Sequence, residues 1–327
     1  MSQNFHVSVA PMMDWTDRHC RWFHRQLSKH TRLYTEMVVA DAVIHGDRNY
    51  LLGFDQIEHP VALQIGGSDP VKLSEASKIG EEFGYDEINI NIGCPSDRVQ
   101  SGRFGACLMA EPDLVAECYN SMSEAVDVPV TVKCRLGIDD QDLDKTLPEF
   151  IEKVSAAGCS HFIIHARKAW LKGLSPKENR KVPPLDYQLV RDMKSAFPKL
   201  EVVLNGGLND LIVAKSEAHI LDGVMFGRAA YQTPWILTDV DRLFYNGIAC
   251  VKSRDDIAHD IIKYAKSHER KDRTTKALIR HIMGLYAGEK GARTWRRTLS
   301  EQSAKGLMPS DVIAAALNAR NRSEMAA

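Results

Sequence analysis

Short apolar runs alternate with longer amphipathic segments along most of this chain. Eight runs that are rich in branched residues and bounded by turn formers predict β-strands. The predicted strands are His6–Ala10, Leu33–Val38, Val61–Ile65, Asp86–Ile90, Val130–Lys133, His161–His165, Glu201–Leu204 and Gly223–Phe226. The segments between them have helical periodicity, which is clearest at Asp69–Phe83, Pro112–Ala125, Thr146–Ala157 and Tyr187–Ala196.

Strands that alternate with helices pair in parallel, and eight such units close into a (β/α)8 TIM barrel. An open doubly wound sheet is the competing architecture, but no Gly-x-Gly-x-x-Gly motif follows the first predicted strand. After residue 240 only helical periods remain, at Ser253–Ser267, Asp272–Tyr286 and Ser310–Ala319. The pattern therefore predicts an α/β fold, with a TIM barrel domain over residues 1–240 and a small all-helical domain over residues 241–327.

The composition is that of an ordinary globular protein. The 327 residues are 44% hydrophobic, which is enough to form a sizeable core. No stretch is long and apolar enough to span a membrane, and the N-terminus has neither part of an export signal. The seven cysteines form no Cys-x-x-Cys pair, which argues against a disulfide or zinc framework. We therefore expect a cytoplasmic protein with reduced thiols and no bound metal.

The net charge of −1 hides an uneven distribution. Residues 241–327 hold 17 Lys and Arg against 10 Asp and Glu, whereas the rest of the chain holds 25 against 33. A basic C-terminal part on an acidic body indicates an anionic partner such as nucleic acid. A solvated charged surface without a partner is the alternative interpretation.

The most informative segment is residues 88–96, which read Ile-Asn-Ile-Asn-Ile-Gly-Cys-Pro-Ser. An alternating strand ends abruptly there, and a loop with two glycines follows at 102–106. In α/β barrels the carboxyl ends of the strands carry the chemistry, so Cys94 is a candidate catalytic thiol on a loop. A buried core cysteine is the alternative, because free cysteines are among the most buried residues.

The other predicted strands also end in residues suited to chemistry. Gly206 and Gly207 follow the seventh strand, and Gly227 and Arg228 follow the eighth, where barrels commonly bind phosphate. Glycine lets the backbone approach a phosphate closely, and an arginine can pair with it through two hydrogen bonds. Further strand-end candidates are Pro11, Met12, Met13, Gln64, Asn89, Asn91, Lys133, Arg135, His165, Arg167 and Asn205.

Lys133 lies on an apolar strand, where an unpaired lysine is rare. It could form a Schiff base with a carbonyl substrate, or stabilise negative charge on a cofactor ring. His165, one strand further on, could hydrogen-bond the same ring. Together with the apolar residues 11–13 and the predicted phosphate site, these residues suit flavin mononucleotide (FMN), a flat ring system with one phosphate.

Several of these motifs in combination resemble the tRNA-dihydrouridine synthase family, and the resemblance extends over essentially the whole chain. The stretch Ala10–Arg18 is most similar to the bacterial A-type branch, whose substrates are uridines 20 and 20a of the tRNA D-loop. The motifs that carry the resemblance are Ala10–Met12, Asn91–Pro95, Gly105–Ala106, Lys133–Gly137, His165–Arg167, Asn205–Gly207 and Gly227–Arg228.

The resemblance implies a two-step reaction, in which NADPH reduces FMN and reduced FMN passes a hydride to C6 of uracil. Cys94 would donate the proton to C5, which gives 5,6-dihydrouridine. The implied FMN-binding residues are Pro11, Met12, Met13, Gln64, Lys133, His165, Asn205, Gly206, Gly207, Gly227 and Arg228. Saturating the C5=C6 bond requires a hydride donor and an acid, and a thiol is a competent acid.

The resemblance also implies that tRNA is the partner, and that the target base leaves its stack to reach the flavin. Asn91 would hydrogen-bond the uracil edge. Arg293 and Arg296 are three residues apart, so they share a helix face and can straddle a phosphate, and Lys177 and Arg180 have the same spacing. We expect these four residues to bind tRNA and the protein to be a monomer.

Three other hypotheses fit parts of the sequence. A barrel similar to dihydroorotate dehydrogenase would act on a free pyrimidine with FMN, which leaves the basic helical domain unexplained. An aldolase would use Lys133 for a Schiff base, and would be colourless. An RNA-binding barrel without catalysis would bind no flavin. The absorbance spectrum of the purified protein separates the two flavin hypotheses from the others.

Overall fold

The structure is a computed structural model that describes residues 5–268 and 274–325. The first two residues of the helical segment expected at 272–286 lie outside the described residues. The chain divides into two compact units, of which the first comprises Met1–Asp14 and Thr31–Gly227 and the second comprises Trp15–His30 and Arg228–Ala327. Residues 15–30 fall in the second unit because the helix that they form packs against helices from the C-terminal part. The expected division at residue 240 stays a prediction about independent domains.

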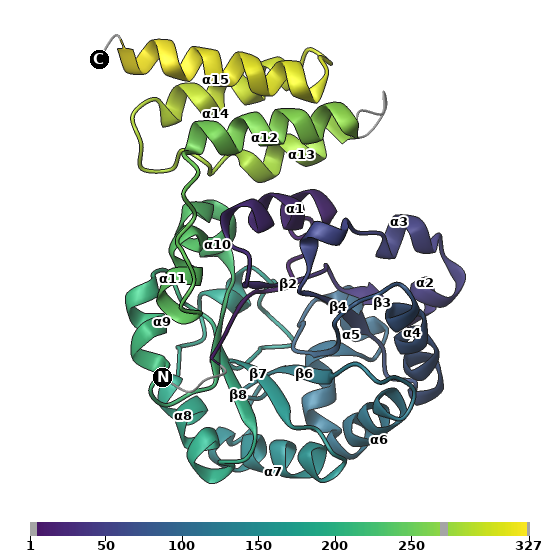
Figure 1. The fold of residues 1–327 in the computed structure, drawn as a ribbon. Coiled ribbons are helices and arrows are strands. Elements are labelled where there is room, and N and C mark those ends of the chain that lie inside the picture. The colour runs from purple at the N-terminus through teal and green to yellow at the C-terminus, as the bar shows by residue number, and fades with distance from the viewer. Residues whose placement is uncertain (1–4, 269–273, 326–327) are drawn as a thin grey trace. The chain divides into compact units, whose positions relative to one another are not determined.

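The first unit is a closed parallel barrel, as the alternation of strands and helices predicted. Its strands are hydrogen-bonded in the order β2-β1-β9-β8-β7-β6-β5-β4-β3, and pairing of β2 with β4 closes the ring (Figure 1). The strands are β1 His6–Val9, β2 Arg32–Tyr34, β3 Val38–Val39, β4 Val61–Gly66, β5 Glu87–Ile92, β6 Val130–Arg135, β7 His161–His165, β8 Glu201–Asn205 and β9 Gly223–Phe226.

The strand expected at Leu33–Val38 is in fact two short strands, β2 and β3. Tyr34 is paired with Ala62 and Val38 with Ile65, so three residues on one side face two residues of β4. The extra residue interrupts the hydrogen bonding of this parallel pair, as in a β-bulge. The hydroxyl of Thr35 compensates, because its Oγ1 lies 3.0 Å from the backbone nitrogen of Gln64 and accepts its hydrogen bond.

Helices surround the barrel strands, as Figure 1 shows for α4, α6, α7 and α8. The α7 helix begins earlier than the sequence pattern suggested, because the carbonyl of Asp142 already accepts hydrogen bonds from the amides of Lys145 and Thr146. The helices of this unit are α2 Ala40–His45, α3 Arg48–Leu52, α4 Pro70–Glu82, α5 Asp97–Ser101, α6 Pro112–Ser123, α7 Leu143–Ala156, α8 Tyr187–Ala196 and α9 Leu211–Glu217, with 3₁₀ turns η1 Gln56–Glu58, η2 Gly105–Ala110 and η3 Glu178–Arg180.

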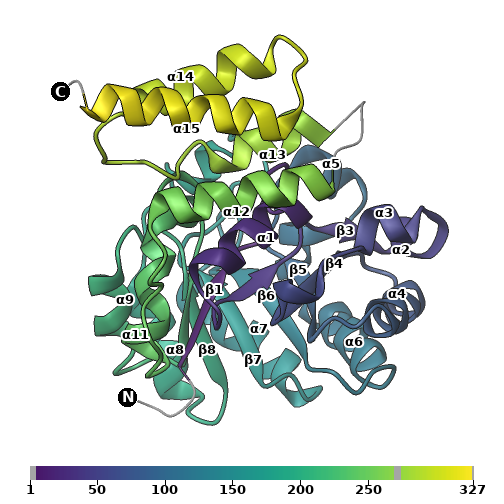
Figure 2. The ribbon, with the colours of Figure 1, turned by 45° about the horizontal axis from the view of Figure 1, so that its top comes forward.

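The second unit is helical throughout its described part. In Figure 2 the long helices α14 and α15 lie side by side near the C-terminus. Trp295 of α14 is fully buried, and its indole nitrogen donates to the carbonyl of Ile282 at 3.1 Å. The helices are α1 Arg18–Leu27, α10 Arg228–Gln232, α11 Val240–Phe244, α12 Arg254–Ser267, α13 Thr274–Ile282, α14 Ala292–Ser303 and α15 Pro309–Met325, with the 3₁₀ turn η4 Pro234–Asp239. None of the helices in the described ranges is long and apolar enough to cross a membrane.

Candidate active site

Cys94 lies two residues beyond the end of β5, on a loop that the preceding strand holds in place. The side-chain oxygen of Asn91 accepts hydrogen bonds from the backbone nitrogens of Gly93 and Cys94, at 3.0 and 2.9 Å. The carbonyl of Cys94 in turn accepts from the amide of Ala106 at 2.9 Å. The thiol is half-buried and lies 3.6 Å from the hydroxyl of Ser96. Both sides of the backbone at Cys94 are therefore fixed while its side chain retains access to solvent.

Residues 105–106 can lie close to the backbone of Cys94 only because residue 105 is a glycine. This residue has φ +75°, and a Cβ atom there would lie 2.6 Å from the carbonyl oxygen of Cys94 and 2.5 Å from Val99. An L-residue would therefore be strained both in its backbone and in its contacts. The loop glycine thus has a definite structural task, which is to let residues 105–106 close over the thiol loop.

A buried polar chain leads from the Cys94 loop into the barrel. Gln64 accepts a hydrogen bond from the amide of Asn91 and donates one to the oxygen of Asn89, both at 2.7 Å. Asn89 then donates to the hydroxyl of Thr131 at 2.7 Å, and this hydroxyl donates to the carboxylate of Glu87 at 2.6 Å. Each polar group thereby finds a partner in a buried region, and the satisfied network sets the orientation of the amides.

The carboxylate of Glu87 is fully buried and closes this chain at its inner end. It forms an ion pair with Arg32 and accepts a hydrogen bond from the hydroxyl of Tyr34 at 2.5 Å. Burial, together with this carboxylate, raises the pKa of Tyr34 well above 10, so the phenol remains a donor. The sequence analysis missed Glu87, although the period of two at residues 87, 89 and 91 places all three on one strand face.

Lys133 lies on β6, directly beside Asn91 in the strand register. Its ammonium group donates to the side-chain oxygen of Asn205 at 3.1 Å, across the intervening strand β7. Burial lowers the pKa of Lys133 to about 8, and the positive charge of Arg135 acts in the same direction. A cation in this setting is costly unless an anionic group comes near it, so the residue is suited to a ligand with negative charge.

His165 and Arg135 lie at the ends of the neighbouring strands β7 and β6. Burial lowers the pKa of His165 well below 6.5, and the cationic Arg135 and Lys133 act in the same direction. His165 is therefore neutral near pH 7 and can donate or accept a hydrogen bond without adding charge. Arg135 is buried, and its Nε donates to the carbonyl of Gly93 at 2.8 Å. The sequence analysis named Arg135 only as a strand-end candidate, and the structure shows that it is a second support of the thiol loop.

The glycines after β8 let the side chains of His165 and Leu185 lie closer to the backbone than any other residue there would permit. Gly206 has φ +111°, and a Cβ atom there would lie 2.6 Å from the ring of His165. Gly207 has φ +69°, and its Cβ would meet Leu185 at 2.4 Å. At Gly227, after β9, open space surrounds the position of a Cβ atom. These three glycines are therefore consistent with a backbone cradle at the ends of β8 and β9.

The structure places the remaining predicted cofactor residues in two groups. Met12 packs against an apolar cluster of the barrel interior, Pro11 is half-buried, and Met13 is 56% exposed. These three residues follow β1 and belong to the same unit as Cys94 and Lys133. Arg228, in contrast, opens α10 and is the first residue of the second unit after Gly227.

The predicted tRNA-binding cations divide between the two units. Lys177 caps the 3₁₀ turn η3 of the first unit and Arg180 is its last residue, whereas Arg293 and Arg296 lie on α14 of the second unit. The loop that carries the first pair is held from inside by Asn179, which is fully buried. The amide of Asn179 donates to the backbone carbonyls of Trp170 and Leu174, and its oxygen accepts from the backbone nitrogen of Trp170, so this loop has a defined shape.

A further link ties the loop after β7 to the loop of Cys94. The amide of Gln100, on α5, donates to the carbonyls of Pro95 and Leu171, each at 2.9 Å. A neutral amide with two donors can bridge two carbonyls in this way. No motif in the sequence marks Gln100, because one of its partners lies on a loop 71 residues further along the chain.

Comparison with known proteins identifies the family and supports the barrel fold. Residues 8–319 match the sequence profile of a family described as dihydrouridine synthase. Two solved structures share the barrel with only 12% sequence identity. An old yellow enzyme homologue from Zymomonas mobilis has a TM-score of 0.53 and matches 74% of this chain and 88% of its own. A 2-naphthoyl-CoA reductase complex has a TM-score of 0.56 and matches 72% of this chain and 50% of its own. At such low identity these two structures support the fold alone.

The sequence relatives are much more similar. A protein from Yersinia pestis is 54% identical over 91% of this chain. One from Vibrio parahaemolyticus is 53% identical over 93% of it, and one from Synechocystis is 50% identical over 96%. The aligned regions cover 86%, 94% and 94% of those proteins, and each bears the name tRNA-dihydrouridine(20/20a) synthase. This chain belongs to the dihydrouridine synthase family, and it is therefore an oxidoreductase.

Proposed function

We propose that this protein reduces uridines 20 and 20a in the D-loop of tRNA to 5,6-dihydrouridine. The observation that carries the proposal is the similarity of nearly the whole chain to relatives that bear this name, at 50 to 54% identity. The site supports it, because a half-buried thiol and a half-buried lysine lie at the ends of the adjacent strands β5 and β6. Reduction of a pyrimidine double bond requires an acid and a site for a hydride donor, and these positions suit both.

The residues at the strand ends fit a flavin, and we propose that it is FMN. Lys133 offers a half-buried positive charge for the ring, Gln64 and His165 offer neutral hydrogen-bonding groups, and residues 11–13 offer apolar surface. The phosphate would lie at residues 205–207 and Gly227, and open space surrounds the Cβ position of Gly227. When bound, this cofactor supplies the hydride for C6 of uracil, and NADPH is the source of its electrons.

In this proposal Cys94 is the proton donor. Its S–H bond breaks as a C–H bond forms at C5 of the uracil, and the resulting thiolate takes a proton from solvent afterwards. The two backbone hydrogen bonds from residues 93–94 to Asn91 hold the thiol loop in position for this transfer. Asn91 uses its oxygen and one amide hydrogen inside the protein, which leaves its second amide hydrogen for a uracil carbonyl.

The exposed cations are proposed to bind the rest of the tRNA. Lys177 and Arg180 would act from the first unit, and Arg293 and Arg296 from the second. Contacts with phosphates are independent of sequence and set the orientation of the nucleic acid, which in turn selects the base that reaches the site. In this proposal the four cations bind phosphates, and the residues at the strand ends recognise the uracil ring.

One experiment tests the proposed function against its alternatives. The purified protein is examined for flavin absorbance and is then incubated with NADPH and an unmodified tRNA transcript. We expect flavin bands, NADPH consumption that depends on tRNA, and a gain of two hydrogens at positions 20 and 20a by mass mapping. A colourless protein would refute the flavin assignment and favour a Schiff base at Lys133, whose low pKa suits a nucleophile. Reduction of free pyrimidines without tRNA would refute the substrate.

A further inference from the structure

The second unit contains a pocket of about 200 Å³, and of its lining residues only Arg296 has a role in the proposed function. It lies where α10, α13 and α14 of this unit meet. Two of its walls are cationic, because α13 contributes Arg280 and α14 contributes Arg296. The complete lining is Tyr231, Gln232, Arg280, Met283, Gly284 and Arg296.

Two backbone segments approach each other very closely beside the pocket. A Cβ atom on Gly284 would lie 2.5 Å from the carbonyl oxygen of Gln232 and 2.8 Å from Pro234, so only glycine fits there. On the same side, the hydroxyl of Tyr231 donates to the carbonyl of Arg280 at 3.2 Å and lies 3.1 Å from Nδ1 of His281. These contacts join α10 to the end of α13 and give the pocket fixed walls.

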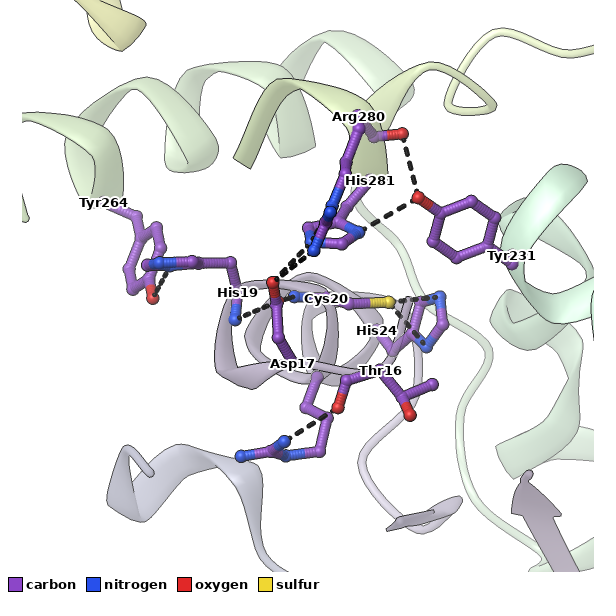
Figure 3. Close-up of polar contacts among 10 residues, drawn as sticks. Thr16, Asp17, His19, Cys20, His24, Tyr231, Tyr264, Arg280 and His281 are labelled. Atoms are coloured by element: carbon purple, nitrogen blue, oxygen red, sulfur yellow. Dashed lines mark hydrogen bonds and ion pairs between the residues drawn. The ribbon is translucent and has the colours of Figure 1, made fainter. Parts of the chain in front are cut away.

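Asp17 holds the side chain of Arg280, as Figure 3 shows. One of its oxygens caps α1, because it accepts from the amides of His19 and Cys20 at 2.9 and 3.0 Å. The other oxygen accepts from a guanidinium nitrogen of Arg280 at 3.2 Å and lies 2.9 Å from Nε2 of the buried His281. Although burial alone would raise it, these contacts with His281 hold the pKa of Asp17 well below its usual range. The carboxylate is therefore charged, and it orients Arg280 before any ligand arrives.

The charge balance of the pocket favours an anion. Its lining, as far as the chain is described, includes two guanidinium groups; Asp17 already pairs with that of Arg280 at 3.2 Å, so the net positive charge comes from Arg296. Arg296 is exposed, and one turn away on the same helix lies Arg293. The ring of Tyr231 stacks on Trp15, with 4.2 Å between centroids and 14° between planes, and with Met283 it forms an apolar wall. A cationic pocket with one apolar wall suits a phosphate that carries a sugar.

We propose that this pocket binds one backbone phosphate of the tRNA, held jointly by Arg280 and Arg296. The inference rests on the proposed function and adds to it a defined subsite and a residue, Arg280, that the sequence analysis did not assign. Guanidinium groups pair with phosphate through two parallel hydrogen bonds, and a guanidinium already oriented by a carboxylate loses little freedom on binding. The attached ribose would lie against Tyr231 and Met283.

The phosphates of NADPH have the same chemistry and are the alternative occupant. The structure favours RNA, because exposed cations continue along α14 beyond the lining of the pocket. The pocket also adjoins the further cation Arg293 on α14, as expected for a ligand with successive phosphates. The experiment below distinguishes these sources.

The decisive measurement is the salt dependence of tRNA binding in a set of variants. Arg280→Gln and Arg296→Gln should each weaken binding of an unmodified tRNA transcript about tenfold and lower the salt slope by about 0.7. Because both residues hold the same phosphate, the double variant should lower the slope by no more than either single variant. Arg280→Gln combined with Arg293→Gln should instead lower it by about twice as much, because two phosphates are then left unbound.

A matched control is Arg297→Gln on the same helix. Arg297 is exposed but lies 3.9 Å from Glu301 and does not line the pocket, so this variant should bind tRNA as the wild type does. Circular dichroism confirms that each variant is folded, and Arg296→Gln tests the pocket without disturbing Asp17.

Three results would overturn the pocket while the proposed function stands. The first is wild-type tRNA affinity in Arg280→Gln. The second is additive changes of the salt slope in the Arg280/Arg296 double variant. The third is a higher KM for NADPH with unchanged tRNA binding in these variants, which would assign the site to the dinucleotide. A wild-type protein that binds no tRNA would instead refute the proposed function itself, before any variant is compared.

Discussion

The backbone nitrogen of Cys94 donates a hydrogen bond to the side-chain oxygen of Asn91 at 2.9 Å. This hydrogen bond links a buried residue near the end of β5 to the thiol that follows the strand. Asn91 is itself held by Gln64, which belongs to the polar chain that ends at the buried Glu87. The position of the thiol is therefore set by residues inside the barrel and not by the loop alone.

The first prediction concerns the thiol. Cys94→Ala should lower the rate of dihydrouridine formation by about 10²–10⁴-fold, because a positioned proton donor contributes about that much. The matched control is Cys107→Ala, which removes another half-buried cysteine from the same segment of the chain. Product formation is measured by mass spectrometry of the tRNA, with NADPH oxidation in the absence of tRNA recorded alongside. A Cys94→Ala protein as active as the Cys107→Ala protein would exclude Cys94 as the acid.

The second prediction concerns Asn91. Asn91→Ala removes the acceptor for two backbone amides, and we expect about a 10²-fold loss of kcat, since a displacement of about 1 Å at a reacting group has an effect of that size. Asn91→Asp keeps the acceptor and removes only the donor to Gln64, so it should recover part of the activity. Single-turnover kinetics with prereduced enzyme measure the step directly. Equal losses in the two variants would show that the amide donor, and not the support of the loop, is what matters.

The third prediction concerns Lys133 and pH. Burial lowers the pKa of Lys133 to about 8 in the protein without a ligand, and a bound anionic flavin should raise it. Binding then takes up a proton, so flavin affinity should be highest below pH 8 and fall above it, by up to about tenfold per pH unit. His165 stays neutral over this range because its pKa lies well below 6.5.

The measurement for this third prediction is the dissociation constant of FMN between about pH 7 and 10, on either side of the lysine's pKa. Lys133→Met should bind FMN more weakly and lose the pH dependence, which would also make the purified protein paler. The control is Lys153→Met, which removes a lysine that is paired with Asp113 on the barrel exterior. An unchanged pH profile in Lys133→Met would show that another group controls the affinity.

The fourth prediction concerns the helical unit. Arg293→Ala combined with Arg296→Ala should weaken tRNA binding and lower its salt slope by about 0.7–0.9 for each phosphate that the protein no longer neutralises. The modified position should also shift, because phosphate contacts set the orientation of the nucleic acid. Filter binding over a range of salt concentrations and mass mapping of the product measure the two effects. Wild-type affinity and slope in the double variant would mean that these arginines are only a solvated surface.

The sequence by itself determined the architecture of the barrel and the order of its strand ends. Eight short apolar runs separated by amphipathic segments leave few folds other than a closed parallel barrel, and the structure has that fold. The strand ends of a parallel barrel gather at one rim, so the candidate residues from Pro11 to Gly227 could be grouped before any coordinates were known. Local patterns were sufficient here because periodicity and turn glycines act within a few residues.

Tertiary structure alone decided how these residues are supported. Glu87, Gln100 and Arg135 support the thiol loop through partners that lie on other strands and loops, and no local pattern records such pairs. The same holds for Asp17, whose carboxylate reaches Arg280 and His281, 263 and 264 residues later in the chain. It also holds for the short strands β2 and β3, where the register of β4 creates the extra residue. Hydrogen bonds and close packing between distant segments depend on the folded geometry, which the one-dimensional pattern does not contain.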